Sequence, residues 1–269
     1  MVRIILIFMS IINILMMTCC KSIVNKMAFY PDTTTVISPD KLPENVEELY
    51  IDTIDNIKIQ SYWIPNKYSD TILIYFHGNA GNISQRLPDL MQLSSFGINV
   101  LGVGYRGYGN SQGKPSEQGI YIDGKSALNY VMEKLDFQLE NILILGRSIG
   151  SAVAIKTVQN MNISGLILVA PLTSGKDLAK ASNLGFVSFL AGKSFDNINR
   201  ISNITSPLLV IHGTDDNVIP FEMGKTVFHE AKVIKKFIEI EGANHNNLST
   251  TYRSSYWAPI HDFIMGNDR

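Results

Sequence analysis

The stretch of sequence that decides the fold is Gly146-Arg147-Ser148-Ile149-Gly150, a G-x-S-x-G motif. The apolar run 142–145 precedes it and the small, helix-compatible run 151–155 follows it, which predicts a strand, a tight turn and a helix. Such a turn lifts a serine hydroxyl off the end of a sheet, and glycines on both sides allow a strained backbone. The motif alone arises by chance in roughly one chain in ten of this length. Its position between a strand and a helix makes Ser148 a candidate nucleophile.

The rest of the chain alternates between predicted strands and helices. Mainly apolar runs of strand length are typical of strands buried on both faces of a parallel sheet, and they occur at 71–76, 98–103, 142–145, 165–169, 208–211 and 237–240. Between them, helices are expected near 116–135, 149–160, 221–231 and 247–264. Upstream, 48–54 and 57–63 alternate around Asp55-Asn56, which predicts a hairpin. The predicted fold class is α/β, with a mostly parallel, doubly wound sheet and an antiparallel N-terminal edge.

One connection is longer than an ordinary loop. Residues 171–206 contain no clear strand, so we expect a short helical lid insertion there. Its apolar part, 184–190, is either a surface helix that packs on the sheet or part of the wall of a substrate pocket. With 269 residues and 45% hydrophobic content, the chain can form one large domain, which we expect to span 46–269, after a connector at 21–45.

The first twenty residues differ in composition from all that follow. Arg3 precedes the apolar run 4–17, which is shorter than the roughly 20 residues of a spanning helix and closer to the apolar core of a signal peptide. Cys19 and Cys20 come directly afterwards, as in the lipid-attachment site of bacterial lipoproteins, although Met and Thr stand where that motif prefers smaller residues. Residues 1–20 are therefore an exported lipoprotein signal, a signal-anchor helix or an apolar terminus without a targeting role. The first two interpretations predict attachment to a membrane.

Several classes of function lack support in the composition. The formal net charge of −1, with acids and bases mixed along the chain, differs from the basic stripe of a nucleic-acid-binding protein. No HExxH or CxxC motif is present, and the five histidines are scattered. We therefore expect no nucleic-acid partner, no metal and no cofactor.

A nucleophilic serine needs a base, and the base needs an acid that holds one tautomer. The segment 212–220 follows one predicted strand and contains Asp215 and Asp216, and the segment 242–247 follows the last strand and contains His245. Loops at these strand ends are where active sites form in such sheets. The order of serine, aspartate and histidine is the order that one doubly wound sheet requires.

Five motifs together resemble the α/β-hydrolase superfamily, and most closely its Bem46-like and ABHD17-like serine hydrolases. They are His-Gly-Asn-Ala-Gly-Asn at 77–82, Tyr-Arg-Gly-Tyr-Gly-Asn-Ser at 105–111, Gly-Arg-Ser-Ile-Gly at 146–150, His-Gly-Thr-Asp-Asp at 212–216 and Ala-Asn-His at 243–245. The resemblance runs from about Val46 to the C-terminus. It implies a Ser148–His245–Asp216 triad that forms and hydrolyses an acyl-enzyme.

The resemblance also implies roles for neighbouring residues. The acid stands at the fifth position of His-Gly-x-x-Asp, which is Asp216, while Asp215 would face solvent or cap the turn. The oxyanion of the tetrahedral intermediate needs two N–H donors, for which Ile149 and either Asn79 or Ala80 are expected. His77 and His212 are expected to bond loop backbone groups, and the loop 105–109 to support the site.

The predicted function is therefore a serine hydrolase, of the carboxylesterase or thioesterase type, that cleaves small-molecule or lipid-like acyl esters or thioesters. The ABHD17-like branch includes protein depalmitoylases, so a long-chain acyl-thioesterase is one alternative. An amidase or peptidase would use the same triad. A non-catalytic scaffold that binds a lipid or a partner at a membrane is the alternative of a different class.

Overall fold

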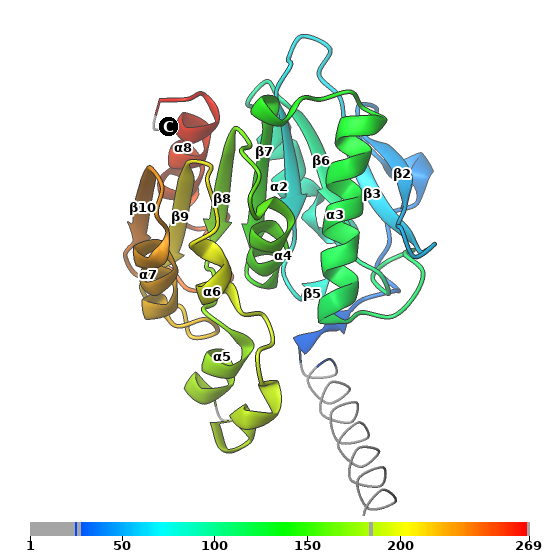
Figure 1. The fold of residues 1–269 in the computed structure, drawn as a ribbon. Helices are drawn as coiled ribbons and strands as arrows, with labels where there is room; N and C mark the ends of the chain where they lie inside the picture. The colour runs from blue at the N-terminus through cyan, green and yellow to red at the C-terminus, as the bar shows by residue number, and fades with distance from the viewer. Residues whose placement is uncertain (1–24, 26–27, 183–184, 268–269) are drawn as a thin grey trace, which may run out of the picture.

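The computed structural model describes residue 25, residues 28–182 and residues 185–267, and its centre is an eight-stranded sheet with the order β10-β9-β8-β7-β4-β6-β3-β2 (Figure 1). Strand β2 (Glu47–Asp52) is antiparallel to β3 (Lys58–Ile64), which is antiparallel to β6 (Asn99–Val103). The other pairs are parallel, and their strands are β4 (Ile72–Phe76), β7 (Ile142–Arg147), β8 (Gly165–Val169), β9 (Leu208–Gly213) and β10 (Lys235–Ile240). The predicted parallel sheet with an antiparallel edge is confirmed.

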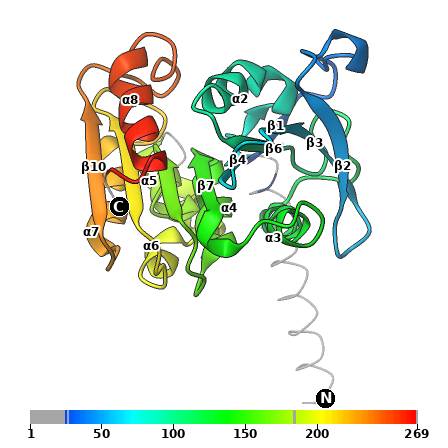
Figure 2. The ribbon, with the colours of Figure 1, turned by 90° about the horizontal axis from the view of Figure 1, so that it is seen from above.

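Helices cover both faces of this sheet, as the view from above shows (Figure 2). One face carries α2 (Leu87–Ser94) and α8 (Arg253–Ile264), and the other carries α3 (Glu117–Glu133), α4 (Ile149–Val158) and α7 (Phe221–Glu230). Side chains of β4 alternate between two hydrophobic cores, because successive residues of a strand point to opposite faces. Burial on both faces explains why these strands are continuous apolar runs in the sequence.

Two helices differ from the sequence-based expectation. Helix α2, which starts with Leu87-Pro88, was not predicted, because an eight-residue helix contains too few turns for a clear apolar period. Helix α8 begins only at Arg253, not near 247. The N–H groups of Thr250, Thr251 and Tyr252 all bond the Asn247 carbonyl, so the segment before the helix forms turns and not a regular helical ladder.

The lid insertion between β8 and β9 consists of three short helices. They are α5 (Gly175–Ala181), the 3-10 helix η4 (Gly185–Ala191) and α6 (Asn197–Ile201). Helix α5 and η4 project from one end of the molecule, below the sheet in Figure 1. The insertion therefore has helical structure of its own, as its length suggested.

Part of the expected connector packs against the domain. Strand β1 (Tyr30–Pro31) pairs in parallel with β5 (Ala80–Gly81), which follows β4. Phe29 is buried and its ring lies 6.1 Å from that of Phe195 in the lid insertion. The polar composition of this segment had indicated only a link between two regions. No helix in the described part of the chain is long and apolar enough to cross a bilayer.

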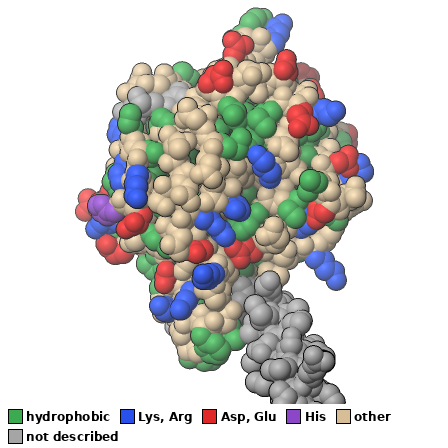
Figure 3. Space-filling view, viewed as in Figure 1, with side chains coloured by type: hydrophobic (Ala, Val, Ile, Leu, Met, Phe, Trp, Pro, Cys, Tyr) green, Lys and Arg blue, Asp and Glu red, His purple; other side chains and the backbone are tan. Residues whose placement is uncertain are grey.

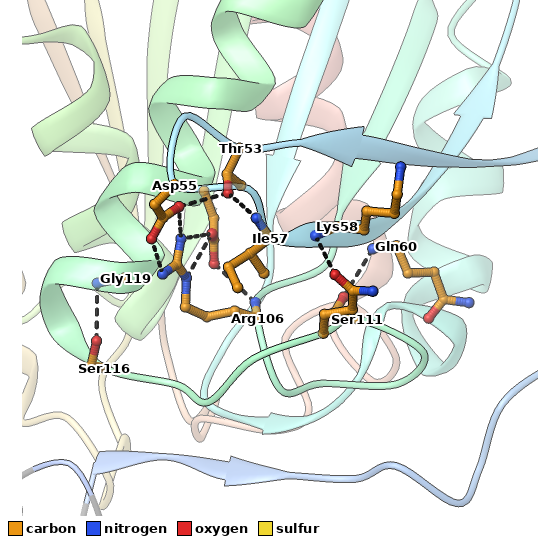
Figure 4. Close-up of polar contacts among 11 residues, drawn as sticks. Thr53, Asp55, Ile57, Lys58, Gln60, Arg106, Ser111, Ser116 and Gly119 are labelled. Atoms are coloured by element: carbon orange, nitrogen blue, oxygen red, sulfur yellow. Dashed lines mark hydrogen bonds and ion pairs between the residues drawn. The ribbon is translucent and has the colours of Figure 1, made fainter.

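Arg106 ties the edge hairpin to helix α3 (Figure 4). Its guanidinium donates to both carboxylate oxygens of Asp55 at 2.7 and 2.9 Å, and its Nε donates to Asp123 at 2.9 Å. Burial raises the pKa of Asp123 to about 6, and its hydrogen bonds with Arg106 oppose that rise. The loop after β6 is thus a rigid support, as expected from the sequence.

Candidate active site

Ser148 lies at the sharp turn between β7 and α4 and has a strained backbone, with φ 56° and ψ −123°. A non-glycine residue with positive φ costs about 1–2 kcal/mol and persists only where its surroundings hold it. Here the Ser148 N–H donates to the Val169 carbonyl at 2.8 Å, and the Ser148 carbonyl accepts from the Ser151 hydroxyl at 2.6 Å. The turn therefore presents the serine hydroxyl in one fixed position.

The two glycines of the motif serve close packing, which differs from the expectation that they would adopt the strained backbone. Neither has a positive φ. A Cβ atom on Gly150 would lie 2.2 Å from the Phe76 carbonyl oxygen, and one on Gly146 would lie 2.4 Å from the Gly150 carbonyl oxygen. The helix α4 thus approaches β4 and β7 too closely for any side chain at these positions. The strain itself falls on Ser148.

Three predicted residues form one hydrogen-bonded chain. His245 Nε2 lies 3.1 Å from the Ser148 hydroxyl, and His245 Nδ1 lies 2.7 Å from Asp216 Oδ2. Ser148 follows β7, Asp216 follows β9 and His245 follows β10, so parallel strands bring together residues that are far apart in the sequence. All three side chains are buried. Their distances match those of a nucleophile, a base and an orienting acid.

The loop after β9 holds Asp216 as a carboxylate. Its Oδ1 accepts hydrogen bonds from the backbone N–H groups of Val218 at 2.9 Å and Ile219 at 2.8 Å. Burial alone raises the pKa of Asp216, but hydrogen bonds from His212 and His245 outweigh it and hold the pKa below its ordinary value. Asp215, the neighbouring candidate, is exposed, and its carboxylate accepts a hydrogen bond from the Thr214 hydroxyl at 3.1 Å.

His212 also contacts the loop after β9. Its Nε2 lies 3.0 Å from the Ile219 carbonyl oxygen and 3.4 Å from Asp216 Oδ2. Gly224 of α7 makes room for the ring, because a Cβ atom there would lie 2.1 Å from His212 Nδ1. His77 likewise bonds its own loop, with Nδ1 2.6 Å from the Gly78 carbonyl oxygen, and burial lowers its pKa to about 3.

The expected oxyanion donors occupy different environments. Ile149 is the first residue of α4, so its backbone N–H has no carbonyl partner within the helix. Asn79 and Ile149 both line the cavity beside Ser148, whereas Ala80 is exposed in β5 and is not among the described residues of the cavity wall. The Tyr108 hydroxyl donates to the Asn79 carbonyl at 2.7 Å. This geometry favours Asn79 over Ala80.

Arg147 contributes to the site although sequence reasoning gave it no role. Its Nη2 donates to the His245 carbonyl at 2.8 Å, and its Nη1 lies 3.8 Å from Asp89 Oδ2 on α2. Arg147 thus links α2 to the loop that carries His245. One feature of the sequence indicates this role. Arg147 stands at the end of a buried strand, where a charged side chain needs a polar partner.

A cavity of about 360 Å³ lies beside Ser148, and its wall is largely apolar. The lid insertion supplies much of the wall through Leu172, Leu178, Ala179, Leu190 and Phe195. Two other lid side chains, Phe186 and Phe189, are 79% and 69% exposed. The lid therefore lines the pocket with some residues and presents others to solvent. Figure 3 shows hydrophobic side chains at its lower tip with basic side chains beside them.

Some of the sequence-based predictions are not tested by the described structure. Cys19 and Cys20 fall outside the described residues, so their proposed lipidation stays a prediction. The catalytic roles of Ser148, His245 and Asp216 also stay predictions, although the structure brings these three side chains together.

Comparison with known proteins identifies several relatives. The profile of the family described as "Serine aminopeptidase, S33" matches residues 68–199. The protein bem46 of Schizosaccharomyces pombe is 34% identical over 248 residues, which cover 87% of this chain and 81% of bem46. The uncharacterized protein YfhR of Escherichia coli is 30% identical over 88% of this chain and 86% of its own length.

The human alpha/beta hydrolase domain-containing protein 17B is 36% identical over 177 residues, which cover 65% of this chain. The match spans only 60% of the length of that relative. Among solved structures, the Pyrococcus furiosus esterase Pf2001 superposes with a TM-score of 0.74 at 21% identity and covers 88% of this chain and 98% of the esterase. At that identity the superposition establishes the shared fold.

Proposed function

The chain belongs to the Bem46-like branch of the α/β-hydrolase superfamily, and from that premise we propose that it is a serine hydrolase that cleaves carboxylic esters or thioesters. The observation that carries the proposal is the hydrogen-bonded chain from the Ser148 hydroxyl through His245 to Asp216 at the wall of an apolar cavity. Fold alone would support only a hydrolase.

The proposed reaction has two steps. The Ser148 oxygen bonds to the acyl carbon as His245 Nε2 takes its proton, and the N–H groups of Ile149 and Asn79 stabilise the oxyanion. The bond to the leaving group then breaks, and His245 returns the proton to that group. In the second step water attacks the acyl-enzyme, again giving its proton to His245, and Ser148 regains the proton when the acid departs.

Asp216 contributes by holding one tautomer of His245. Its Oδ2 accepts the Nδ1–H of the imidazole, so Nε2 is free to accept the serine proton. Turnover is therefore lost at acid pH, where the protonated imidazole has no acceptor. Activity that is flat from pH 8 to pH 4 contradicts this mechanism.

The cavity supports a substrate with an apolar acyl group. Its wall beside Ser148 consists mainly of aliphatic and aromatic side chains, which favour an alkyl chain over a charged or sugar group. A long-chain acyl thioester is the second candidate, and the exposed Phe186 and Phe189 on the lid favour it. Large apolar side chains on a surface are typical of regions that meet a lipid or a partner.

We also retain the proposal that residues 1–20 attach the protein to a membrane. The continuously described part of the chain begins at Ala28. Ala28 and Tyr30 line the same cavity as residues of the lid. An N-terminal attachment would thus hold the mouth of the cavity near the lipid. Fractionation of cells that express the full chain tests the attachment, with Cys19→Ser and Cys20→Ser separating lipidation from an apolar anchor.

Labelling with a fluorophosphonate tests the proposed nucleophile. We expect the full chain to label, and Ser148→Ala and His245→Ala to lose labelling. His229→Ala is the matched control, because His229 is exposed on α7 and is not among the described residues that line the cavity. A folded wild-type chain that fails to label supports the non-catalytic scaffold instead.

A panel of acyl esters, thioesters and amides with increasing chain length then separates the substrate classes. We expect esters or thioesters to be turned over faster than amides. Narrowing the cavity by Ala179→Phe should shift the preferred acyl chain to a shorter one, because Ala179 lies in its wall. Faster turnover of amides or peptides would favour an amidase or peptidase.

A further inference from the structure

The N-terminal segment 28–35, here called the strap, runs along the loop 78–82, here called the oxyanion loop. At Asn79 the two segments exchange hydrogen bonds. The Tyr30 N–H donates to the Asn79 carbonyl at 3.1 Å, and the Asn79 side-chain amide donates to the Ala28 carbonyl at 3.2 Å. Both the backbone and the side chain of Asn79 are therefore held from the N-terminal side.

A second set of contacts holds the far end of the oxyanion loop. The Asp32 N–H donates to the Gly81 carbonyl at 3.0 Å. The side-chain amide of Asn82 donates to the carbonyls of Asp32 at 3.0 Å and Thr35 at 2.9 Å. Asn82 is fully buried, so these bonds would be costly to leave unmade.

The strap is itself rigid at this point. The Asp32 carboxylate accepts from the N–H groups of Thr34 at 2.7 Å and Thr35 at 3.0 Å, and from the side chain of Gln85 at 2.9 Å. Hydrogen bonds from Thr35 and Thr34 hold the pKa of Asp32 below its ordinary value. A side chain that closes a turn on its own backbone limits the conformations that the turn can adopt.

The oxyanion loop has few other restraints. It leaves β4 after Phe76 and its regular structure is the two-residue pairing with β1. Beyond the strap, the Tyr108 hydroxyl bonds the Asn79 carbonyl and Arg86 bonds the Ala80 carbonyl. His77 Nδ1 also lies 2.6 Å from the Gly78 carbonyl oxygen, which belongs to the same planar peptide group as the Asn79 N–H. The strap thus supplies most of the hydrogen bonds that hold the carbonyl and side chain of Asn79 and the side chain of Asn82, and it acts together with His77, which holds the peptide group of the Asn79 N–H.

We propose that the strap is a positioning element that aims the backbone N–H of Asn79 at the oxyanion of the proposed reaction. The inference rests on the proposed serine hydrolase function and adds a role for a segment outside the region that the family motifs cover. A consequence is that the segment joining the N-terminus to the domain also sets the rate of the chemical step. Oxyanion donors act mainly in the transition state, so their misplacement lowers kcat more than it raises KM.

The first test is Asn82→Asp in the full chain. The remaining carboxylate oxygen can still accept from the Ser84 N–H, as Asn82 Oδ1 does at 2.8 Å, but both donors to the strap are lost. We expect kcat to fall by about 10- to 100-fold with KM within about twofold, somewhat less than the removal of a whole donor. The affinity for an alkylboronic acid, which forms a tetrahedral adduct with an activated serine, should fall by a similar factor.

The second test acts from the strap and does not touch the oxyanion loop directly. Asp32→Ala removes the acceptor for Thr34 and Thr35, whereas Asp32→Asn keeps one amide oxygen in its place. We expect the alanine variant to lose about 10-fold in kcat and in boronate affinity, and the asparagine variant to retain both. Glu44→Ala, an exposed acid beyond the strap, should match the wild type.

The outcomes separate the two proposals. A wild-type chain that neither labels with a fluorophosphonate nor turns over esters overturns the proposed function. An active wild type with unchanged kcat and boronate affinity in Asp32→Ala overturns the strap, as does a rise in KM alone. If Asn82→Asp fails to fold, the Asp32 pair decides, because Asp32 is only half-buried and lies outside the hydrophobic core, so its replacement leaves the core intact.

Discussion

At the scale of single residues, the strained backbone of Ser148 has a measurable cost. Ser148→Gly and Ser148→Ala both remove the hydroxyl, but only glycine adopts φ near 56° without penalty. We expect the glycine variant to be more stable than the alanine variant by about 1 kcal/mol, although glycine gains more entropy on unfolding. Urea denaturation of the inactive pair measures this, and an alanine variant of equal or greater stability would contradict it.

Asp216 links the activity of the site to the stability of the fold. Its pKa is lower in the folded chain than in the unfolded chain, so its ionised form contributes stability above about pH 4. That contribution is lost as pH falls through the lower folded pKa. Asp216→Asn should therefore flatten the loss of stability in acid and lower kcat by about 10⁴-fold, as in the general triad template.

The neighbouring Asp215 provides the control for that prediction. Asp215→Asn changes the same charge one position earlier, at an exposed side chain outside the hydrogen-bonded chain. Urea unfolding between about pH 4 and pH 2 and ester hydrolysis at neutral pH should both match the wild type for this variant. Equal effects of the two substitutions would show that charge alone, not the contact with His245, determines the result.

At the scale of elements, the packing of α4 on β4 depends on a missing side chain. Gly150→Ala would place a methyl group 2.2 Å from the Phe76 carbonyl oxygen, a backbone atom held in the sheet. Alanine has the better helix propensity, yet we expect a loss of about 3 kcal/mol because the contact cannot relax. The thermal midpoint of unfolding and the yield of folded protein measure this loss.

Gly78→Ala is the matched glycine substitution beside Ser148. A methyl group there would meet its nearest neighbour, the Ser148 Cβ, at 3.5 Å, an ordinary contact. We expect its stability to remain within about 1 kcal/mol of the wild type. A similar loss in both variants would mean that the approach of α4 to β4 is less tight than the structure indicates.

At the scale of the whole molecule, the cavity, the lid and the start of the described chain lie together. Phe186 and Phe189 are exposed on η4, and Lys176, Lys180 and Lys193 flank them in the lid insertion. If the proposed lipid-like substrate enters from an anionic surface, Phe186→Ser with Phe189→Ser should slow the hydrolysis of a vesicle-embedded thioester. Hydrolysis of a soluble short-chain ester should be unchanged, because neither side chain lines the cavity.

Vesicles of neutral lipid provide the comparison for this prediction. The wild type should act faster on anionic vesicles, because lysine side chains near a negative surface each contribute about 1 kcal/mol of attraction. A double variant that loses activity equally on the soluble ester and on vesicles would indicate a collapsed lid rather than a lost contact with lipid.

Much of this organisation follows from the sequence alone. Strands buried on both faces must be continuous apolar runs, so the parallel sheet and its order of elements could be predicted from local patterns. The motif around Ser148 and the strand ends before Asp216 and His245 located the candidate site, since loops at one edge of a parallel sheet converge. These features depend on residues that are close together in the chain.

Only the tertiary structure decided how distant segments meet. The hydrogen bond from Arg147 to the His245 carbonyl joins residues 98 positions apart, and the hydrogen bond from Asn79 to Ala28 joins residues 51 positions apart. The same holds for the lid residues that line the cavity. Such contacts leave no period or motif in the sequence. The local pattern of each segment is compatible with many neighbouring segments, and only the folded backbone determines which of them come into contact.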